Sequence, residues 1–319
     1  MKKIRVGVVG VGYLGRFHAE KYAQMNDVEL VALADTDRSR AATVAAQVGA
    51  SAYSHHRELI GRVDAVSVVV PTSAHFQVSR DFLEHGVDVM IEKPITETLP
   101  EADELIQMSA RSGLIIQVGH LERFNPAVVA LRDIVKHPMF IESHRLSLFK
   151  PRATDVSVVL DLMIHDIDII LNFVQADLDH LHAAGIPVIS GEVDIANARL
   201  EFKNGCVANV TASRISAKNE RKIRLFQSDA YISVDFAQQM ITITRRNGED
   251  HGGPFAGLEI TQRRFAPGDA LEEELKSFVQ AVATRQAPEV SGKVGRDALA
   301  IALSIMDQIN TTNRRFLNK

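Results

Sequence analysis

Residues 4–15 read Ile-Arg-Val-Gly-Val-Val-Gly-Val-Gly-Tyr-Leu-Gly, an apolar run that continues into closely spaced glycines. The apolar run predicts a buried strand, and Gly10, Gly12 and Gly15 have the spacing of the turn that leads from a strand into a helix in dinucleotide-binding proteins. Glycines allow the tight bend and the close approach of a pyrophosphate, whose charge the helix N-terminus stabilises. The stretch therefore predicts a dinucleotide-binding unit.

Asp35 indicates which dinucleotide is bound, because it lies 20 residues past Gly15 at the end of the second predicted strand. An acid there accepts hydrogen bonds from the adenosine ribose 2′-hydroxyl and repels a 2′-phosphate, so we expect NAD rather than NADP. Arg38 and Arg40 leave NADP open as an alternative. The expected cofactor contacts of this region are Gly10, Gly12, Tyr13, Leu14, Gly15 and Asp35.

The first 121 residues alternate short β-branched runs with segments of helical periodicity. Near-continuous apolar runs are typical of strands buried on both faces, so the pattern predicts an α/β fold with a doubly wound parallel sheet, a Rossmann domain over residues 1–121. The expected strands are Ile4–Val9, Val28–Ala34, Ala65–Val70, Val87–Ile91 and Leu114–Val118, and the expected helices are Tyr13–Met25, Arg38–Val48, Ala74–Glu84 and Pro100–Arg111.

The pattern changes after Phe124-Asn125-Pro126. Several strands with turn signals follow, and one signal is an Asn204-Gly205 pair of the kind that makes a tight hairpin. They predict an antiparallel meander and hence a second, α+β domain over residues 122–319. Further expected elements are helices Pro126–Val135, Val156–Val174, Ala270–Thr284 and Gly295–Asn313, strands Phe140–Leu148, Ala198–Phe202, Cys206–Ala212 and Met240–Arg245, and a surface loop Asn247–Leu258.

Composition excludes several classes of function. Lys plus Arg number 36 and Asp plus Glu 40, a formal net charge of −4, so we expect no nucleic-acid partner. The single Cys206 allows neither an intramolecular disulfide nor a cysteine-based metal cluster, which favours a reducing compartment. Glycines break the apolar N-terminal run, and no stretch of about 18 apolar residues occurs, so neither a signal peptide nor a membrane span is expected. We therefore expect a cytoplasmic protein.

Further polar residues follow later strands at the carboxyl edge of the predicted sheet, where such folds bind ligands. Pro71, Thr72 and His75 come after the third core strand, and we expect them to border the cofactor. Helix capping by Thr72 or by Ser73 is an equally good interpretation of those two residues. Glu92-Lys93-Pro94 ends the fourth core strand, which places Glu92 and Lys93 at the crevice.

The most apolar predicted helix contains Asp161, His165 and Asp168, which stand at i, i+4 and i+7 and so share one face. Because such a helix must be buried, these groups need a ligand, water or other polar partners. A satisfied core network is the alternative to a reaction site. We expect no metal, since Asp-x-x-x-His supplies only two ligands.

Together, Gly-x-Gly-x-x-Gly, Glu92-Lys93-Pro94 and Asp161-x-x-x-His165 resemble the motifs of the glucose–fructose oxidoreductase, inositol dehydrogenase and MocA (Gfo/Idh/MocA) family, over nearly the whole chain. The resemblance implies an open, mostly antiparallel second sheet that forms the interface of a homodimer or homotetramer, with a sugar or cyclitol bound between the domains. It also implies that Lys93, Asp161 and His165 are the catalytic residues.

Residues 119–126 and 159–168 look closest to a bacterial subgroup, the UDP-N-acetylglucosamine 3-dehydrogenases. This likeness implies a 3-keto product that passes to a partner aminotransferase, for a diamino sugar of lipid A. Residues 156–160 depart from the wider family, in which many members have a glycine-rich run, so a simple polyol substrate is less well supported. The expected substrate contacts are Lys93, Arg123, Asn125, Arg152, Asp161 and His165.

Basic residues suit a diphosphate on the substrate. The stretch from Arg199 to Arg224 has seven basic residues against two acids, a net of +5. Arginine pairs well with phosphate oxygens, and we favour Arg152 as the phosphate contact because it closely precedes the helix of Asp161. A solvated strand face or a subunit contact is the alternative for any one of these basic residues.

These residues suit an alcohol oxidation in which His165 accepts the hydroxyl proton while a hydride passes to nicotinamide. Asp161 would orient His165, and Lys93 would stabilise the developing alkoxide or itself relay the proton. Two other functions stay open. One is an NAD(P)-dependent dehydrogenase of a free sugar, inositol or sugar acid, and the other is a non-catalytic NAD(P)-binding regulator.

Overall fold

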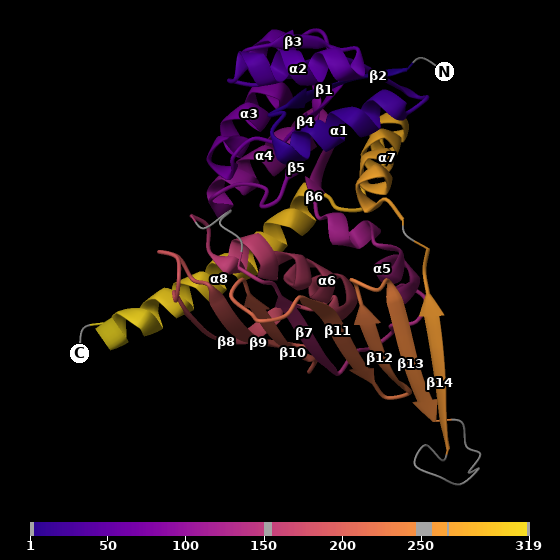
Figure 1. Ribbon diagram of the computed structural model, residues 1–319, viewed down its shortest axis with the longest axis vertical. Helices are drawn as coiled ribbons and strands as arrows, with labels where there is room; N and C mark the ends of the chain where they lie inside the picture. The colour runs from indigo at the N-terminus through magenta and orange to yellow at the C-terminus, as the bar shows by residue number, and fades with distance from the viewer. Residues whose placement is uncertain (1–2, 150–154, 247–256, 267, 318–319) are drawn as a thin grey trace. The chain divides into compact units, whose positions relative to one another are not determined.

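The computed structural model describes residues 3–149, 155–246, 257–266 and 268–317, and over these ranges the chain folds into two compact units. The first unit comprises Met1–Leu121 with Asp269–Leu299, and the second comprises Glu122–Gly268 with Ala300–Lys319. Figure 1 shows the helices and strands of each unit. Each unit has a sheet of its own, and the predicted α/β fold class is confirmed.

The described part of the first unit contains a six-stranded sheet with parallel pairings throughout. The strand order β3-β2-β1-β4-β5-β6 is that of a doubly wound sheet, which reverses direction between β1 and β4. Ligands bind outside the carboxyl ends of the strands at such a reversal. The strands are β1 (Ile4–Val9), β2 (Val28–Ala34), β3 (Ser51–Tyr53), β4 (Ala65–Val68), β5 (Asp88–Glu92) and β6 (Ile116–Gly119).

The sequence predicts five of these strands to within two residues at each end and misses β3. β3 has three residues, Ser-Ala-Tyr, which are too few for an apolar alternation to show. It pairs with β2 at the edge of the sheet, where Ala32 lies opposite Ser51. Backbone pairing rather than an apolar pattern therefore defines this strand.

Local signals in the sequence set the ends of the helices in the first unit. Asp37 caps α2 by accepting the N–H of Arg40, and Gly49 ends that helix with a φ of 73°. Thr98 and Glu101 form a reciprocal capping box at the start of α4. Each such cap contributes about 1 kcal/mol. The helices are α1 (Tyr13–Gln24), α2 (Arg38–Val48), η1 (His56–Leu59), α3 (Thr72–Glu84) and α4 (Leu99–Ser112).

Helix α7 (Ala270–Thr284) also belongs to the first unit, although the sequence pattern assigned every residue after 121 to a second domain. Leu275 and Phe278 are fully buried in the core that α1 and α2 share with β1 and β2. The amide of Gln117 on β6 donates a hydrogen bond to the carbonyl oxygen of Glu274 at 2.9 Å. The assignment of α7 to the second domain is therefore wrong. An amphipathic pattern shows that a helix has a buried face but does not reveal which sheet that face covers.

The described part of the second unit contains an eight-stranded sheet of order β14-β13-β12-β11-β7-β10-β9-β8. Its pairings are antiparallel except that of β7 with β10. The sheet is therefore mostly antiparallel but is not the predicted meander, because β7 lies between β10 and β11. The strands are β7 (Phe140–Leu146), β8 (Leu178–Ile186), β9 (Ile195–Phe202), β10 (Val207–Ser213), β11 (Glu220–Gln227), β12 (Ala230–Asp235), β13 (Met240–Arg246) and β14 (Leu258–Arg264).

The Asn204-Gly205 hairpin is confirmed. Gly205 has a φ of 87° and joins β9 to β10, which pair antiparallel. The predicted surface loop from Asn247 lies outside the described residues over 247–256, and Leu258, which was expected to end that loop, begins β14.

One face of the eight-stranded sheet is buried. In β9, for example, Ala198 and Leu200 are fully buried while Asn197 and Arg199 are exposed. Figure 1 shows α5 and α6 on the same side of this sheet. The helices that include residues of this unit are η2 (Leu121–Phe124), α5 (Pro126–Leu131), the π-helical turn η3 (Val159–Met163), α6 (Ile164–Val174) and α8 (Gly292–Leu317).

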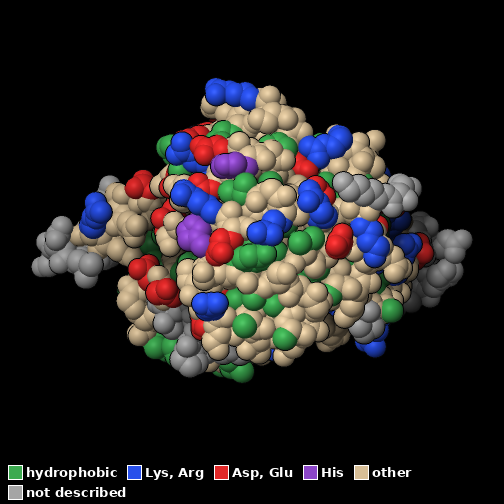
Figure 2. Space-filling model, turned by 90° about the horizontal axis from the view of Figure 1, so that it is seen from above, with side chains coloured by type: hydrophobic (Ala, Val, Ile, Leu, Met, Phe, Trp, Pro, Cys, Tyr) green, Lys and Arg blue, Asp and Glu red, His purple; other side chains and the backbone are tan. Residues whose placement is uncertain are grey.

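The distribution of charged side chains on the surface agrees with the nearly equal numbers of acidic and basic residues in the sequence. Figure 2 shows acidic and basic side chains interspersed over the face that it presents. None of the helices in the described ranges is both long enough and apolar enough to cross a membrane.

Candidate active site

The glycine loop between β1 and α1 has the close contacts that its spacing predicts. Gly10 has a φ of 83°, and a Cβ there would lie 2.4 Å from the carbonyl oxygen of Val69. A Cβ at Gly15 would lie 1.8 Å from the carbonyl oxygen of Gly10. A Cβ at Gly12 would meet no atom of the described residues within 4 Å. The fold therefore requires Gly10 and Gly15, whereas Gly12 borders space that suits a pyrophosphate.

Asp35 lies at the end of β2 beside this loop and is 8% exposed. Its Oδ2 accepts the backbone N–H of Val11 at 2.9 Å, and its Oδ1 accepts that of Asp37 at 2.8 Å. Arg40, whose side chain is half exposed, reaches the carboxylate at 3.5 Å. The bond from Val11 ties the glycine loop to the end of β2, and the two bonds together hold Asp35 in one orientation, as an acceptor for ribose hydroxyls requires.

A cavity of about 830 Å³ in the first unit is lined by ten of the eleven residues predicted to bind the cofactor, all within the described ranges. Gly15 is the exception, because it packs beneath the loop against Gly10. The volume is typical of a cofactor site, so the residues fit NAD. The predicted residues that line it are Gly10, Gly12, Tyr13, Leu14, Asp35, Pro71, Thr72, His75, Glu92 and Lys93.

The cavity also includes residues that the sequence did not indicate. Thr36 follows β2, and Ser54, His55 and His56 follow β3. Ser54, His55 and His56 were missed because β3 was missed. Polar residues at the carboxyl end of a strand are the signal that would have found them.

His75 lines this cavity but is 1% exposed and is occupied by backbone contacts. Its Nδ1 lies 2.8 Å from the carbonyl oxygen of Pro94 and its Nε2 lies 2.9 Å from that of Val70. Burial lowers the pKa of His75, and hydrogen bonds to these carbonyls oppose the shift only in part. Its ring therefore joins the turn after β4 to the Glu92-Lys93-Pro94 segment.

Thr72 and Ser73 are not the cap of α3. The helix begins at Thr72, its N-cap residue is Pro71, and no side chain of the described residues caps it. The capping interpretation of Thr72 and Ser73 is therefore wrong. Pro71 and Thr72 instead line the cofactor cavity.

Lys93 directly follows Glu92, which forms a partly buried hydrogen bond that the sequence did not predict. His18 on α1 is 1% exposed, and its Nε2 lies 3.2 Å from Oε1 of Glu92. The second carboxylate oxygen of Glu92 accepts the backbone N–H of Lys93 at 3.2 Å. Burial raises the pKa of Glu92, but the bond and charge of His18 and the charge of Lys93 lower it by more. Glu92 is thus an anion that holds the backbone at Lys93, and His18 lies three residues past Gly15, about one helical turn.

Asp161 and His165 belong to the second unit, on the π-helical turn η3 and the first turn of α6, and both are partly buried. π-helical turns are rare in proteins, and those that occur often lie at functional sites. Asp168, the third member of the predicted face, is 1% exposed, and Arg123 donates to its two carboxylate oxygens at 2.6 and 3.0 Å. The core-network interpretation is right for Asp168, and Asp161 and His165 stay the candidates for chemistry.

The structure gives two of the expected substrate contacts partners within the chain. Arg123 is 4% exposed and is held by Asp168. The side-chain oxygen of Asn125 accepts the N–H of Ala127 at 3.0 Å and so caps α5. Both residues have roles within the fold. Arg152, the favoured phosphate contact, lies outside the described residues.

A second cavity, of about 290 Å³, lies within the second unit and includes Asp161. Arg214 and Arg221 also line it, and they are two of the seven basic residues between Arg199 and Arg224. Their residue type alone does not distinguish them from the other five. The lining residues are Leu146, Ser147, Leu148, Asp161, Leu162, Arg214, Asn219, Glu220, Arg221 and Ala237.

Family models match both halves of the chain. Residues 4–120 match the Gfo/Idh/MocA model described as an oxidoreductase family with an NAD-binding Rossmann fold, and residues 136–233 match the Gfo/Idh/MocA C-terminal domain. The chain belongs to the Gfo/Idh/MocA oxidoreductase family. The predicted family, the NAD cofactor and the dehydrogenase class are thereby confirmed for this Gfo/Idh/MocA protein.

Relatives of this Gfo/Idh/MocA protein have different named substrates. It is 39% identical to the UDP-N-acetylglucosamine 3-dehydrogenase of Acidithiobacillus ferrooxidans over 306 residues, which are 96% of this chain and 97% of the relative. A solved structure of that enzyme superposes with a TM-score of 0.91 at 38% identity and covers 98% of this chain and 99% of its own. The myo-inositol 2-dehydrogenase of Thermotoga maritima is 26% identical over 93% of this chain and 94% of the relative. Membership of the family therefore leaves the substrate to be assigned.

Proposed function

We propose that this Gfo/Idh/MocA protein oxidises the 3-hydroxyl of UDP-N-acetylglucosamine to a ketone. The observation that carries the proposal is 39% identity over 96% of the chain to an enzyme named for that reaction, against 26% to the inositol dehydrogenase of T. maritima. The arginines beside Asp161 in the second cavity add support, since guanidinium groups bind the oxygens of a diphosphate well.

Within this proposal Lys93, Asp161 and His165 carry the chemistry. Bound NAD supplies the acceptor for the hydride that leaves the sugar carbon. His165 takes the hydroxyl proton, because an imidazole titrates near neutral pH, and Asp161 orients it. Lys93 stabilises the negative charge that develops on the oxygen, and direct proton transfer to Lys93 is the alternative. Glu92 holds the backbone of Lys93 through the 3.2 Å bond described above.

The test measures the absorbance of reduced nicotinamide after purified protein is mixed with NAD and UDP-N-acetylglucosamine. A ketone trap is present because alcohol oxidation by NAD is uphill at neutral pH. Free N-acetylglucosamine, myo-inositol and glucuronate are parallel substrates. We expect reduction with the sugar nucleotide and its loss in His165→Asn. Equal rates with a free sugar or inositol would overturn the substrate, and no reduction with any of them, once NAD binding is verified, would favour a regulator.

The product and the setting of the reaction follow from the same proposal. A 3-keto sugar nucleotide is a substrate for an aminotransferase, whose product would be a diamino sugar nucleotide for lipid A. A cytoplasmic location agrees with the supply of NAD and of sugar nucleotides. Conversion of the ketone to an amine by an added aminotransferase and amino donor would test this step, and absence of a diamino product would contradict it.

We assign the interface of a homodimer or homotetramer to the exposed face of the eight-stranded sheet. Phe140, Phe226 and Tyr231 form a row across β7, β11 and β12, with ring centroids 5.5 and 4.9 Å apart. All three residues are partly exposed and alternate with the buried residues of their strands. Light scattering should give a dimer or tetramer mass, and a monomer would contradict the assignment.

A further inference from the structure

Arg214 and Arg221 differ from the neighbouring basic residues in the face of the sheet that they occupy. Arg221 is in phase with the buried Ile223 of β11, and Arg214 directly follows the buried end of β10. Both line the cavity that contains Asp161. Lys222, the next residue of β11, alternates to the opposite face and pairs with Asp235 at 3.5 Å.

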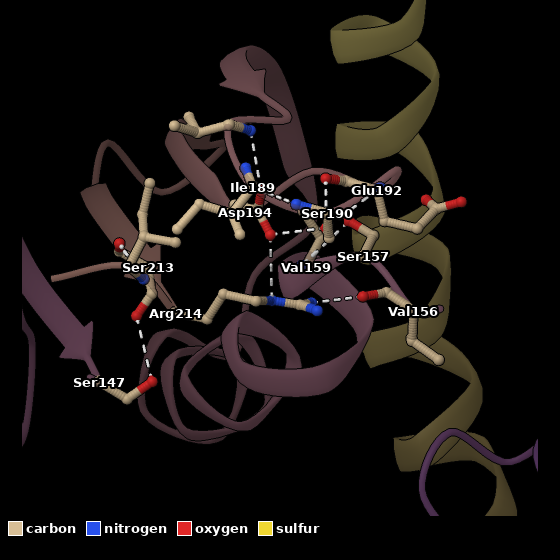
Figure 3. A network of polar contacts seen from close by, with 12 residues as sticks. Ser147, Val156, Ser157, Val159, Ile189, Ser190, Glu192, Asp194, Ser213 and Arg214 are labelled. Carbon is tan, nitrogen blue, oxygen red and sulfur yellow. Dashed lines mark hydrogen bonds and ion pairs between the residues drawn. The ribbon is translucent and has the colours of Figure 1, made fainter. Parts of the chain in front are cut away.

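Arg214 is held from two sides, as Figure 3 shows. The residue is 5% exposed, and its Nε lies 3.8 Å from Oδ1 of Asp194. Its Nη2 donates to the carbonyl oxygen of Val156, which lies just before η3 and Asp161. The guanidinium group therefore has a defined position beside the turn that carries Asp161.

Asp194 is fully buried and makes several hydrogen bonds. Its Oδ2 accepts the N–H groups of Val188, Ile189 and Ser190 at 2.8, 2.7 and 2.9 Å, and its Oδ1 accepts the Ser190 hydroxyl at 2.7 Å. Burial raises the pKa of Asp194, but these hydrogen bonds lower it by more, to well below its ordinary value. Asp194 is thus an anion that orders the loop between β8 and β9 and positions Arg214.

The guanidinium groups of the cavity suit an anionic ligand. Two guanidinium groups, those of Arg214 and Arg221, and two carboxylates, those of Asp161 and Glu220, line it. The carboxylate of Glu220 accepts a hydrogen bond from Lys218 at 2.7 Å, and the charge of Lys218 offsets it. Asp194 does not line the cavity, and its carboxylate already accepts the hydrogen bonds described above. Guanidinium groups that line a small cavity match the oxygens of a phosphate or a carboxylate.

We propose that this cavity binds an anionic group of the substrate through Arg214 and Arg221, and that Asp194 is the positioning residue for Arg214. The group is the diphosphate of a sugar nucleotide if the proposed function is right, and the carboxylate of a sugar acid otherwise. In both cases the two arginines set a preference for an anionic over a neutral sugar. The inference rests on the proposed function only in taking Asp161 as part of the substrate site.

The test is calorimetric titration of the NAD-loaded protein with UDP. It compares the unchanged chain with Arg221→Gln and Arg214→Lys, and the control is Lys222→Gln on the opposite face of β11. We expect the Kd for UDP to rise by about tenfold or more in the two arginine variants and to stay constant in the control. Arg221 is exposed, so its variant carries the test if replacement of the buried Arg214 prevents folding.

Parallel arms separate this inference from the proposed function. If glucuronate binds and UDP does not, and both arginine variants weaken glucuronate, the anion site stands while the sugar-nucleotide function fails. If UDP-N-acetylglucosamine is oxidised with an unchanged kcat/KM in Arg221→Gln and Arg214→Lys, the function stands and the anion site is wrong. The inference is also overturned if neither anion binds more tightly than neutral N-acetylglucosamine.

Discussion

The two units assemble their candidate sites in different ways. In the first unit the residues expected to bind the cofactor lie in short motifs at the carboxyl ends of parallel strands. These strand ends share one edge of the sheet. In the second unit Asp161, Arg214 and Arg221 come from η3, the end of β10 and β11. Neighbouring antiparallel strands run in opposite directions, so strand ends do not collect at one edge. Register and burial, rather than position after a strand, bring these three residues to one cavity.

The units also use buried charges differently. In the first unit the buried pair of His18 and Glu92 adjoins the candidate catalytic Lys93. In the second unit the pair of Arg123 and Asp168 anchors α6 through η2. A buried charge therefore marks a site only where its neighbours line a cavity.

Catalysis provides the largest expected effect, because Lys93 and His165 carry the charge and the proton of the proposed reaction. Lys93→Met and His165→Asn should each lower kcat by about 10²–10⁴-fold, with NAD binding retained. Steady-state nicotinamide absorbance and NAD titration measure the two quantities. Lys203→Met, which changes an exposed lysine paired with Asp177, is the control. Full activity in either site variant would remove that residue from the reaction.

Loss of the Arg123–Asp168 pair should destabilise the second unit strongly. Arg123→Gln leaves a carboxylate that is 1% exposed without its partner, at a cost of about 3–5 kcal/mol in the free energy of unfolding. Arg199→Gln, which removes the exposed pair with Glu201, should cost at most about 1 kcal/mol. Urea unfolding measures both. If Arg123→Gln lowers the free energy of unfolding only slightly and raises KM, Arg123 is a substrate contact instead.

Acidic pH should lower the stability of the first unit, because Asp81 becomes protonated. Burial raises the pKa of Asp81, but hydrogen bonds from Arg57, His56 and Gln77 lower it by more, to about 2 from an ordinary 3.8. A depressed folded-state pKa contributes stability that is present above the ordinary pKa and lost as the pH falls toward 2. Asp81→Asn should therefore cost roughly 1–2 kcal/mol at neutral pH and nearly nothing near pH 2. Urea titrations at several pH values measure this difference, and a cost independent of pH would contradict it.

The smallest expected effects are those of two matched helix caps, Thr98 of α4 in the first unit and Asn125 of α5 in the second. Thr98→Ala and Asn125→Ala should each lower the free energy of unfolding by about 1 kcal/mol. Neither should change KM, because each side chain bonds to the backbone of its own helix. Thermal unfolding and substrate titration measure the two properties, and a raised KM in Asn125→Ala alone would contradict its role as a cap.

The sequence by itself determined the Rossmann sheet, the family and ten residues that line the cavity of the first unit. Its signals there are local, since Gly10 and Gly15 are required by contacts within the loop and its neighbouring strand, and Asp35 lies at the end of the next strand. Such signals can be read from the sequence because the backbone geometry of a few neighbouring residues causes them. The three-residue β3 was the exception, because it has no pattern long enough to detect.

Only the tertiary structure decided which polar residues of the second unit belong to the core and which line a cavity. Along the chain Arg123, Arg214 and Arg221 are equivalent cations. Arg123 meets its carboxylate 45 residues away, and Arg214 reaches the carbonyl of Val156 58 residues away. Desolvation requires a buried charge to have such a partner, but it does not require the partner to be near in sequence. The roles of these arginines therefore followed from sheet register and burial.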